Sequence, residues 1–385
     1  MESDLEKGVT NLLLNCAELK AGESLLVVHE DPKLGWYDDA AALAVRDKAK
    51  AMGLETTWLQ VGAPGLEKDP SLLQQIDNHD STIFFARVGD QDRFGDNNGK
   101  ERSVMVYARD AENLASPFGQ MNHRAMMELK QAVNEVVLGG QQVMITCALG
   151  TRFSGSVPMV ERENDADVTV RRFPLGVPQP VPAGGFSGQV ALTHYLTPTG
   201  SKPYDPPNCK IDGVVMAQVE LGRITGFDGP ADAVAAVERH YDHVSSHFGI
   251  DRNFIHSWHA GIHPGTGYPR SVHDDPDRWS NNVFTHPRFV HFHTCGAYAP
   301  GEICWMVLDP TIEIDGKALW KDGAMVPSQF PAIQQVLERW PELLSQKIMR
   351  IKRRCVEKTF SLPLLSPFGI LLFMPIQSPS WFYSR

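Results

Sequence analysis

The feature that most constrains the fold is the alternation of apolar strands and helices in the first 140 residues. Three apolar runs predict strands, at 24–28, 55–61 and 81–88. Residues 40–52 predict a helix between the first two runs, with Asp38 or Asp39 as its cap and Gly53 after its end. Further helices are predicted at 4–19 and 121–137. Strand, helix and strand in short succession pair in parallel through a right-handed crossover, so the sequence predicts a parallel α/β domain.

The pattern changes near residue 151, where short β-like runs begin to alternate with proline and glycine turns. Such a pattern is typical of a mainly antiparallel sheet with few helices. One helix is expected at about 230–248, with Pro230 in its first turn. We therefore predict an α/β fold with a parallel amino-terminal domain, a mainly antiparallel α+β domain and a cleft between them. The predicted boundaries are 1–145, 146–330 and, for a helix with an atypical tail, 331–385.

Composition excludes several classes of function. The net charge is −10, whereas a general nucleic-acid-binding protein usually shows a basic face. No glycine-rich phosphate-binding motif follows the first strand, so no nucleotide is expected. The six cysteines are scattered without a CxxC pair, which argues against a zinc ribbon or a disulfide framework. Reduced thiols and an acidic start without an apolar signal segment predict a cytoplasmic location.

The tail has an unusual composition. A basic run at 347–354 precedes the apolar segment 361–376, which prolines interrupt. A surface anchor and a poorly structured extension both fit this pattern. Because no run of about 18 uninterrupted apolar residues occurs, a membrane partner is not expected.

The histidines are unevenly distributed along the sequence, because seven of the 14 lie between His256 and His293. His291 and His293 are two residues apart on a predicted apolar strand, so their imidazoles share one face. Two imidazoles on one face can hold a single metal ion, and a carboxylate would complete a facial triad suited to iron or zinc. Glu302 is the nearest carboxylate, and Cys304 offers a softer thiolate on the same face.

A second predicted strand, ending before Pro264, supplies further candidates. His259 lies on one of its faces, and His256 and Trp258 lie on the other. The predicted metal ligands are His259, His291, His293, Glu302 and Cys304. The predicted ligand-binding residues are His256, Trp258, His263, Tyr268 and Tyr298. Aromatic side chains among them could stack on a ring-bearing ligand. The alternative is structural, because histidines on strands often bond to backbone carbonyl groups.

Three segments resemble the aminopeptidase T-type metallo-aminopeptidases. KIDGVVMAQVELGRITGFDG at 210–229 is similar to their E-x-G-x-I hairpin. HAGIHPG at 259–265 is similar to their G-x-N-P turn, and EIDGKALWKDGAMV at 313–326 is similar to their closing hairpin. The related 2,5-dihydroxypyridine dioxygenases, which use one iron, have the same frame. The resemblance spans about 5–326 and implies a two-domain α/β fold, commonly dimeric, with its site in a cleft.

The resemblance also assigns positions in the two-metal site of the peptidases. Their histidine in an I-H-x-A-x-G strand matches His291. Their two glutamates fall at Gly185 and near Ser257, and their I-H-W-D pair falls on Cys304 and Met306. In the dioxygenase register, the ligand positions fall near Ser257, His293, Glu302 and Cys304. A two-metal hydrolase needs bridging carboxylates to hold both ions, so two-metal peptidase activity is predicted to be lost.

Two functions fit this departure from the family. In the first, the protein binds a peptide or amino-acid-like ligand in a cleft lined by histidine and aromatic residues, as a pseudoenzyme in a biosynthetic pathway. In the second, one divalent metal ion, iron or zinc, supports a mononuclear hydrolase or a dioxygenase-like enzyme with a small-molecule ligand. Under both hypotheses we expect a cytoplasmic homodimer.

Overall fold

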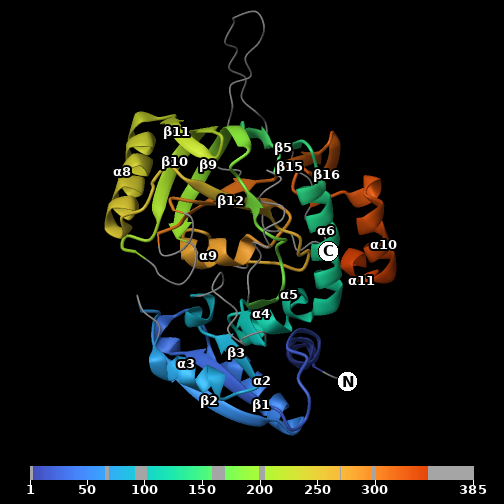
Figure 1. The fold of residues 1–385 in the computed structure, drawn as a ribbon. Coiled ribbons are helices and arrows are strands. Elements are labelled where there is room, and N and C mark those ends of the chain that lie inside the picture. The colour runs from blue at the N-terminus through green and yellow to red at the C-terminus, as the bar shows by residue number, and fades with distance from the viewer. Residues whose placement is uncertain are drawn as a thin grey trace, which may run out of the picture. The chain divides into compact units, whose positions relative to one another are not determined.

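The computed structural model describes residues 3–65, 69–91, 102–157, 170–198, 204–268, 270–296 and 301–345. All of them belong to one compact unit, Met1–Ile351, which Figure 1 shows as coloured ribbon. A second unit, Lys352–Arg385, lies outside the described residues, and so does most of the tail whose role the sequence left open. None of the described helices is long and apolar enough to cross a membrane.

The first sheet is parallel throughout and has the strand order β2-β1-β3-β4-β7. Its strands are β1 (Ser24–Glu30), β2 (Glu55–Val61), β3 (Ser81–Phe85), β4 (Ser103–Val106) and β7 (Arg171–Phe173). The predicted parallel pairing of the first three strands is confirmed. The inner strands β1 and β3 are almost entirely buried, which explains why their sequences are continuously apolar rather than alternating.

Helix α2 (Asp39–Ala51) makes the crossover from β1 to β2. Asp38 caps it, because its side chain accepts a hydrogen bond from the backbone N–H of Ala41 at 3.2 Å. The residues it buries are small, which allows close packing: Ala41, Ala42, Val45 and Ala49. This helix therefore begins and ends close to where its capping residues predict.

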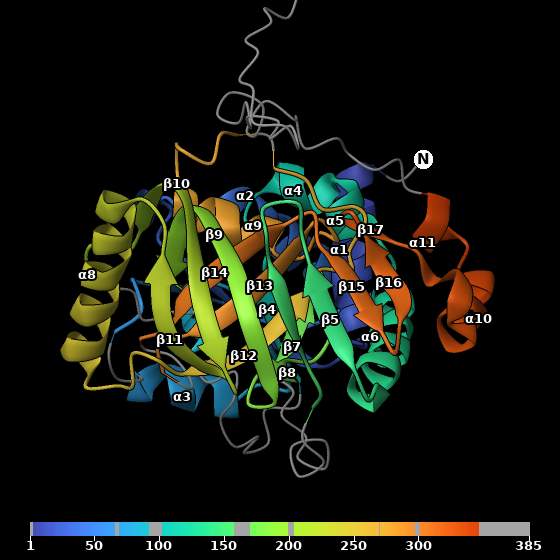
Figure 2. The ribbon, with the colours of Figure 1, turned by 90° about the horizontal axis from the view of Figure 1, so that it is seen from above.

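The second sheet is antiparallel throughout, as the sequence predicts, and Figure 2 shows β5, β9 and β10 in front, with β12, β13 and β14 crossing behind them. Its strand order is β17-β16-β15-β5-β6-β9-β14-β13-β12-β8, and β10 pairs with both β9 and β11. The strands nearest the candidate site are β12 (Ile255–Ala260), β13 (Phe289–Thr294) and β14 (Ile303–Leu308). The others are β5 (Val143–Thr146), β6 (Arg152–Gly155), β8 (Val181–Pro182), β9 (Phe186–Pro198), β10 (Cys209–Glu220), β11 (Arg223–Asp228), β15 (Thr311–Ile314), β16 (Lys317–Lys321) and β17 (Ala324–Met325).

The chain passes between the two sheets more than once. Strands β5 and β6 enter the second sheet, and β7 then returns to pair in parallel with β4 of the first sheet. Phe173, at the end of β7, is buried in the core of the first sheet. This return places β7 and the residues after it beside both sheets. The division into domains at 145 and 330 stays a prediction.

The described helices cover the sheets and supply part of the candidate site. The longer ones are α6 (His123–Gly139), α8 (Ala231–Phe248) and α10 (Pro331–Arg339). The shorter ones are α1 (Asp4–Thr10), α3 (Pro70–Asp77), α4 (Ala111–Ala115), α5 (Pro117–Gln120), α9 (Pro276–Val283) and α11 (Glu342–Ser345). The predictions at 121–137 and 230–248 agree closely with α6 and α8. Helix α9 carries residues of the site and was not predicted from the sequence.

Candidate metal centre

Strand register brings three histidines to one face of the second sheet. His259 on β12 lies directly opposite His291 on β13, and Ser257 lies opposite His293. Side chains directly opposite each other have Cβ atoms about 4.5–5.5 Å apart, and alternate residues of one strand share a face. Because His293 is two residues from His291, all three imidazoles project from the same face.

The three imidazoles form a compact cluster. The rings of His259 and His291 stack with centroids 4.6 Å apart and planes 3° apart. The ring of His293 meets each of the other two edge-on, with centroid distances of 5.1 Å. One nitrogen from each ring lies within 4.8 Å of the others. Three nitrogens about 2.1 Å from one ion lie about 3.0–3.5 Å apart in a facial or tetrahedral arrangement, so the cluster needs to contract by up to about 1.8 Å to hold a single ion.

Burial keeps this cluster suitable for a metal. His259 and His291 are 3% and 4% exposed, and the side chain of His293 is 12% exposed. Burial holds the pKa of His259 well below its usual value, and the positive charges that His291, His293 and Arg172 can carry lower this pKa further. A histidine must be neutral to bind a metal, so this environment favours the form of His259 that coordinates.

Hydrogen-bond partners select the nitrogens that face the cluster. The Nδ1 atom of His259 lies 3.2 Å from the carbonyl oxygen of Pro178, which can only accept. The Nδ1 atom therefore carries the proton, and the Nε2 atom carries the lone pair. The Nδ1 atom of His293 lies 3.3 Å from the Glu302 carboxylate, within ion-pair distance but without the geometry of a hydrogen bond. A metal-binding histidine commonly donates its second N–H to a carbonyl or a carboxylate in this way.

Glu302 and Cys304 lie beside the cluster rather than within the group of three. The Glu302 carboxylate is completely buried against His293, and its backbone carbonyl accepts a hydrogen bond from Tyr204 at 3.1 Å. Cys304 on β14 lies opposite His293 on β13. It also lines a cavity in front of the three histidines, which is described below. The role of Glu302 and Cys304 as direct ligands stays a prediction. Among the described residues, no carboxylate joins the three histidines in a metal-sized group.

The negative charge of Glu302 predicts a measurable effect on metal affinity. The Glu302→Gln variant keeps the shape of the side chain but removes the charge that makes the His293 ring a stronger ligand. We expect metal affinity to fall roughly 10- to 100-fold, as for other carboxylates behind histidine ligands. Competition with a chromophoric chelator measures this affinity. The exposed residue Glu220 provides the control Glu220→Gln, and equal affinities in both variants would contradict the role assigned to Glu302.

Most residues predicted to contact a ligand lie elsewhere in the structure. Trp258 is buried in the main core against Phe186, because it alternates with His259 along β12. His256 shares the Trp258 face in the sequence pattern, and its Nδ1 atom lies 3.0 Å from the Ser257 hydroxyl. Neither Trp258 nor His256 is among the described residues that line the cavity at the histidine cluster.

Of the remaining three predicted contact residues, two pack against other side chains and one lies outside the described residues. His263 is fully buried against Phe118, and its Nδ1 atom accepts a hydrogen bond from the backbone N–H of Gly265 at 3.1 Å. It therefore stabilises the turn after β12. Tyr268 packs against a small cluster that includes Trp279. Tyr298 lies outside the described residues. The roles of these residues as ligand contacts stay predictions.

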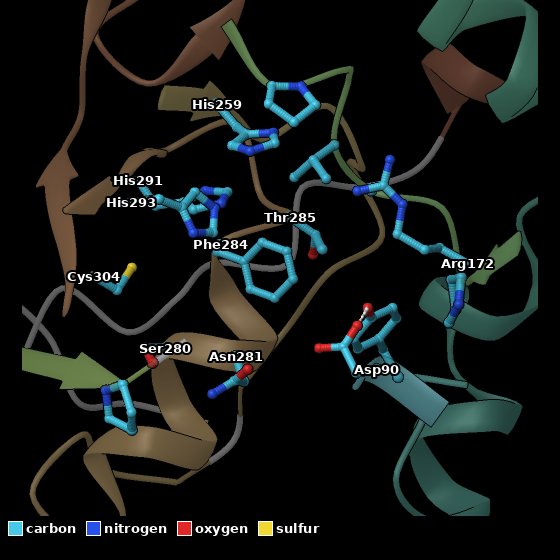
Figure 3. Close-up of a pocket in the computed structure, with 16 residues that line it drawn as sticks. Asp90, Arg172, His259, Ser280, Asn281, Phe284, Thr285, His291, His293 and Cys304 are labelled. Atoms are coloured by element: carbon cyan, nitrogen blue, oxygen red, sulfur yellow. Dashed lines mark hydrogen bonds between the residues drawn. The ribbon is translucent and has the colours of Figure 1, made fainter. Parts of the chain in front are cut away.

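A cavity opens in front of the histidines, and Figure 3 shows the side chains around it. Its volume of about 70 Å³ is several times what a single water needs, which is about 10–15 Å³. The lining residues that could not be identified from the sequence include Asp90, Tyr107, Arg172, Ser280, Asn281 and Phe284. They come from four separate segments without a recognisable motif, so no local pattern could have identified them. A cleft between two domains stays a prediction.

The polar groups of the cavity wall have defined orientations. Tyr107 donates a hydrogen bond to the Asp90 carboxylate at 3.0 Å. The side-chain nitrogen of Asn281 donates to the backbone carbonyl of Asp277 at 2.9 Å, and that carbonyl can only accept. The side-chain oxygen of Asn281 is therefore the atom left to accept from a ligand. The ring of Phe284 meets His291 edge-on at 4.9 Å and forms an apolar wall beside the cluster.

Comparison with known proteins finds similarity in the fold. No family model and no curated protein matches the sequence. The structure is similar to that of 2,5-dihydroxypyridine dioxygenase from Pseudomonas putida KT2440. The TM-score is 0.55 at 14% identity, covering 84% of this chain and 98% of that chain. This chain therefore shares the fold of the dioxygenase at a distance. AmpT from Thermus thermophilus is also similar, with a TM-score of 0.48 at 12% identity, over 84% and 99% of the two chains.

Proposed function

We propose that this protein is a mononuclear metal-dependent enzyme that acts on a small molecule. His259, His291 and His293 would hold one divalent ion, iron or zinc. The observation that carries the proposal is the convergence of three imidazoles from adjacent strands, with their nitrogens within 4.8 Å of one another. A bound ion would supply Lewis acidity, and ferrous iron would also supply oxygen chemistry.

Iron is our first candidate for this ion. Three ligands on one face of a six-coordinate ion leave open positions for substrate and oxygen, as in other non-haem iron sites. The fold is shared with a protein named as a dioxygenase. Zinc is the second candidate, because three histidines with one open position also form a known type of catalytic zinc site. Relationship to the aminopeptidase T-type proteins as a divergent member is part of the proposal.

The sequence predicts the loss of two-metal peptidase activity and leaves a ligand-binding pseudoenzyme as the other possible function. A two-metal peptidase needs bridging carboxylates, and none joins the histidines among the described residues. A pseudoenzyme that binds a peptide or amino-acid-like ligand would not need three converging imidazoles, one of which has its Nδ1 atom hydrogen-bonded to a backbone carbonyl. Homodimerisation and a cytoplasmic location stay proposals.

Metal stoichiometry tests the proposed function directly. The protein is purified without a histidine tag and loaded anaerobically with Fe²⁺ or, separately, with Zn²⁺. After gel filtration, elemental mass spectrometry is expected to find about one ion per chain. When both metals are supplied together in equal amounts, we expect the protein to retain more of one metal than of the other. Less than about a tenth of an ion per chain with either metal would refute the enzyme proposal and favour a metal-free binding protein. Near two ions per chain would instead point to the two-metal site.

A further inference from the structure

A second cavity lies where the helices α6, α10 and α11 meet the strand β17 of the second sheet. Figures 1 and 2 both show α10 beside α11 on this side of the sheet. The volume of the second cavity is about 370 Å³, larger than that of the cavity at the histidines. Pockets that hold small-molecule ligands have volumes of about 300–1,000 Å³. The second cavity therefore has the size of a ligand site.

The wall of the second cavity is mainly apolar. Leu129 on α6, Ile333 on α10 and Leu343 on α11 contribute buried aliphatic side chains. Ile262, which follows β12, is fully buried in the same wall, and Met325 on β17 is half-buried. Contact with such a wall removes apolar surface of a ligand from water, which is favourable. The body of a ligand that fits this cavity is therefore apolar.

The charged groups of the wall argue against an anionic ligand. Arg288 is the only arginine or lysine among the described lining residues. Its Nε and Nη2 atoms donate to the two carboxylate oxygens of Asp309 at 2.5 and 2.7 Å, so its charge is already balanced. Asp322 also lines the cavity and is exposed, so it adds a negative charge. A neutral ligand therefore suits this wall better than an anion.

One buried hydrogen-bond donor in the wall lacks a partner. His286 lines the cavity and is 3% exposed. Its Nδ1 atom accepts a hydrogen bond from the backbone N–H of Arg288 at 3.0 Å, so the proton of the neutral ring lies on Nε2. Burial and, to a lesser degree, the charge of Arg288 lower the pKa of His286 to about 4, so the ring is neutral near pH 7. The Nε2 atom has no hydrogen-bond partner among the described residues. An unpaired buried N–H is costly, and an acceptor on a ligand would remove that cost.

We infer that the second cavity binds a small neutral molecule that is mainly apolar and carries a hydrogen-bond acceptor, such as a ketone or an ester. The apolar body would contact the aliphatic wall, and the oxygen would accept a hydrogen bond from the Nε2–H of His286. The inference does not depend on the metal centre, because the two cavities share none of their described lining residues.

A matched pair of probes tests the hydrogen bond. Benzophenone and diphenylmethane have the same two rings, but only benzophenone has a carbonyl oxygen. Calorimetry measures the affinity of both probes for wild type, His286→Phe and the control His240→Phe. His240 is also buried, but it lies on α8 and does not line the cavity. The ratio of benzophenone affinity to diphenylmethane affinity should fall about three- to tenfold in His286→Phe, because one hydrogen bond is lost, and should not change in His240→Phe.

Photochemical labelling locates the bound probe. Irradiated benzophenone adds across nearby C–H bonds, so peptide mapping identifies the side chains that it contacts. We expect adducts on Met325 and on other side chains of the cavity wall. Ala324 also lines the cavity, so Ala324→Trp should weaken benzophenone binding at least about 10-fold by steric overlap. The control Ala231→Trp changes an exposed residue at the start of α8 and should bind like wild type.

The outcomes test the site and the ligand class separately from the proposed function. Failure of wild type to bind either probe, or adducts confined to residues outside the cavity, would overturn the inference. An unchanged affinity ratio in folded His286→Phe would overturn it too, and if that variant does not fold, the Ala324→Trp comparison decides. The anionic probe 4-benzoylbenzoate should bind more weakly than benzophenone, and tighter binding would overturn the neutral class. The His291→Ala/His293→Ala variant should bind benzophenone like wild type, whether or not the protein holds a metal.

Discussion

Replacing both His291 and His293 with alanine is expected to abolish metal binding. These residues supply two of the three nitrogens that lie within 4.8 Å of one another, and a single remaining imidazole cannot hold a divalent ion tightly. The metal content should fall from about one ion per chain to less than a tenth of an ion. The free energy of unfolding in the presence of metal should fall to that of the metal-free protein, because binding to the folded state alone stabilises it.

A matched control comes from another pair of histidines. His243 and His247 stack on the outer part of α8, with ring centroids 6.2 Å apart, and both are exposed. The double variant His243→Ala/His247→Ala removes the same number of imidazoles and should keep full metal content. Circular dichroism confirms that both variants are folded. Retention of stoichiometric metal by folded His291→Ala/His293→Ala would refute the proposed centre.

The face that each histidine occupies on its own strand could be predicted from the sequence, because the alternation of side chains along a strand is a local property. The two-residue spacing places His291 and His293 on one face, and the same rule separates His259 from Trp258. The pairing of His259 with His291 joins positions 32 residues apart and depends on register, which no local pattern determines. The sequence predicts that the two strands contribute histidines to one site, and the strand register shows which of these histidines lie opposite each other.

The surroundings of the centre could not be predicted for the same reason. Arg172 approaches the histidines because β7 returns to the first sheet after β5 and β6, and this topology leaves no trace in the composition. Glu302 was expected on the metal itself, whereas in the structure its carboxylate lies against the Nδ1 atom of His293. Spacing identifies which residue types are near one another, but it does not identify which atom of each residue faces the ion.

Acid is expected to destabilise the metal-free protein steeply below pH 6.5. Burial lowers the pKa of His263 to about 3 and the pKa values of three further histidines to about 4: His123, His240 and His286. In the unfolded chain these groups regain a pKa of about 6.5. Below that pH the unfolded state binds protons that the folded state excludes, so stability falls as the pH falls. Each group contributes up to about 1.4 kcal/mol per pH unit, down to its folded pKa.

One buried carboxyl group opposes this trend. Burial raises the pKa of Asp277 from 3.8 to about 7, so the folded state takes up its proton first and gains stability as the pH falls from 7. The net slope expected from these five groups is roughly 4 kcal/mol per pH unit between pH 6 and 4.5. Between pH 6 and 4.5 the protein should therefore lose about 6 kcal/mol, a large share of the total stability of about 5–15 kcal/mol that is usual for folded proteins.

Urea unfolding at a series of pH values, with EDTA present to remove metal, measures this slope. The variant His240→Leu replaces a buried imidazole on α8. This imidazole packs beside the ring of Tyr204, with ring centroids 5.7 Å apart. It should reduce the slope by about 1.4 kcal/mol per pH unit, because one proton fewer distinguishes the two states. The control His243→Leu removes an exposed histidine from the same helix and should leave the slope unchanged. Equal slopes in both variants would show that burial of His240 does not control its protonation, which is the physical basis of the prediction.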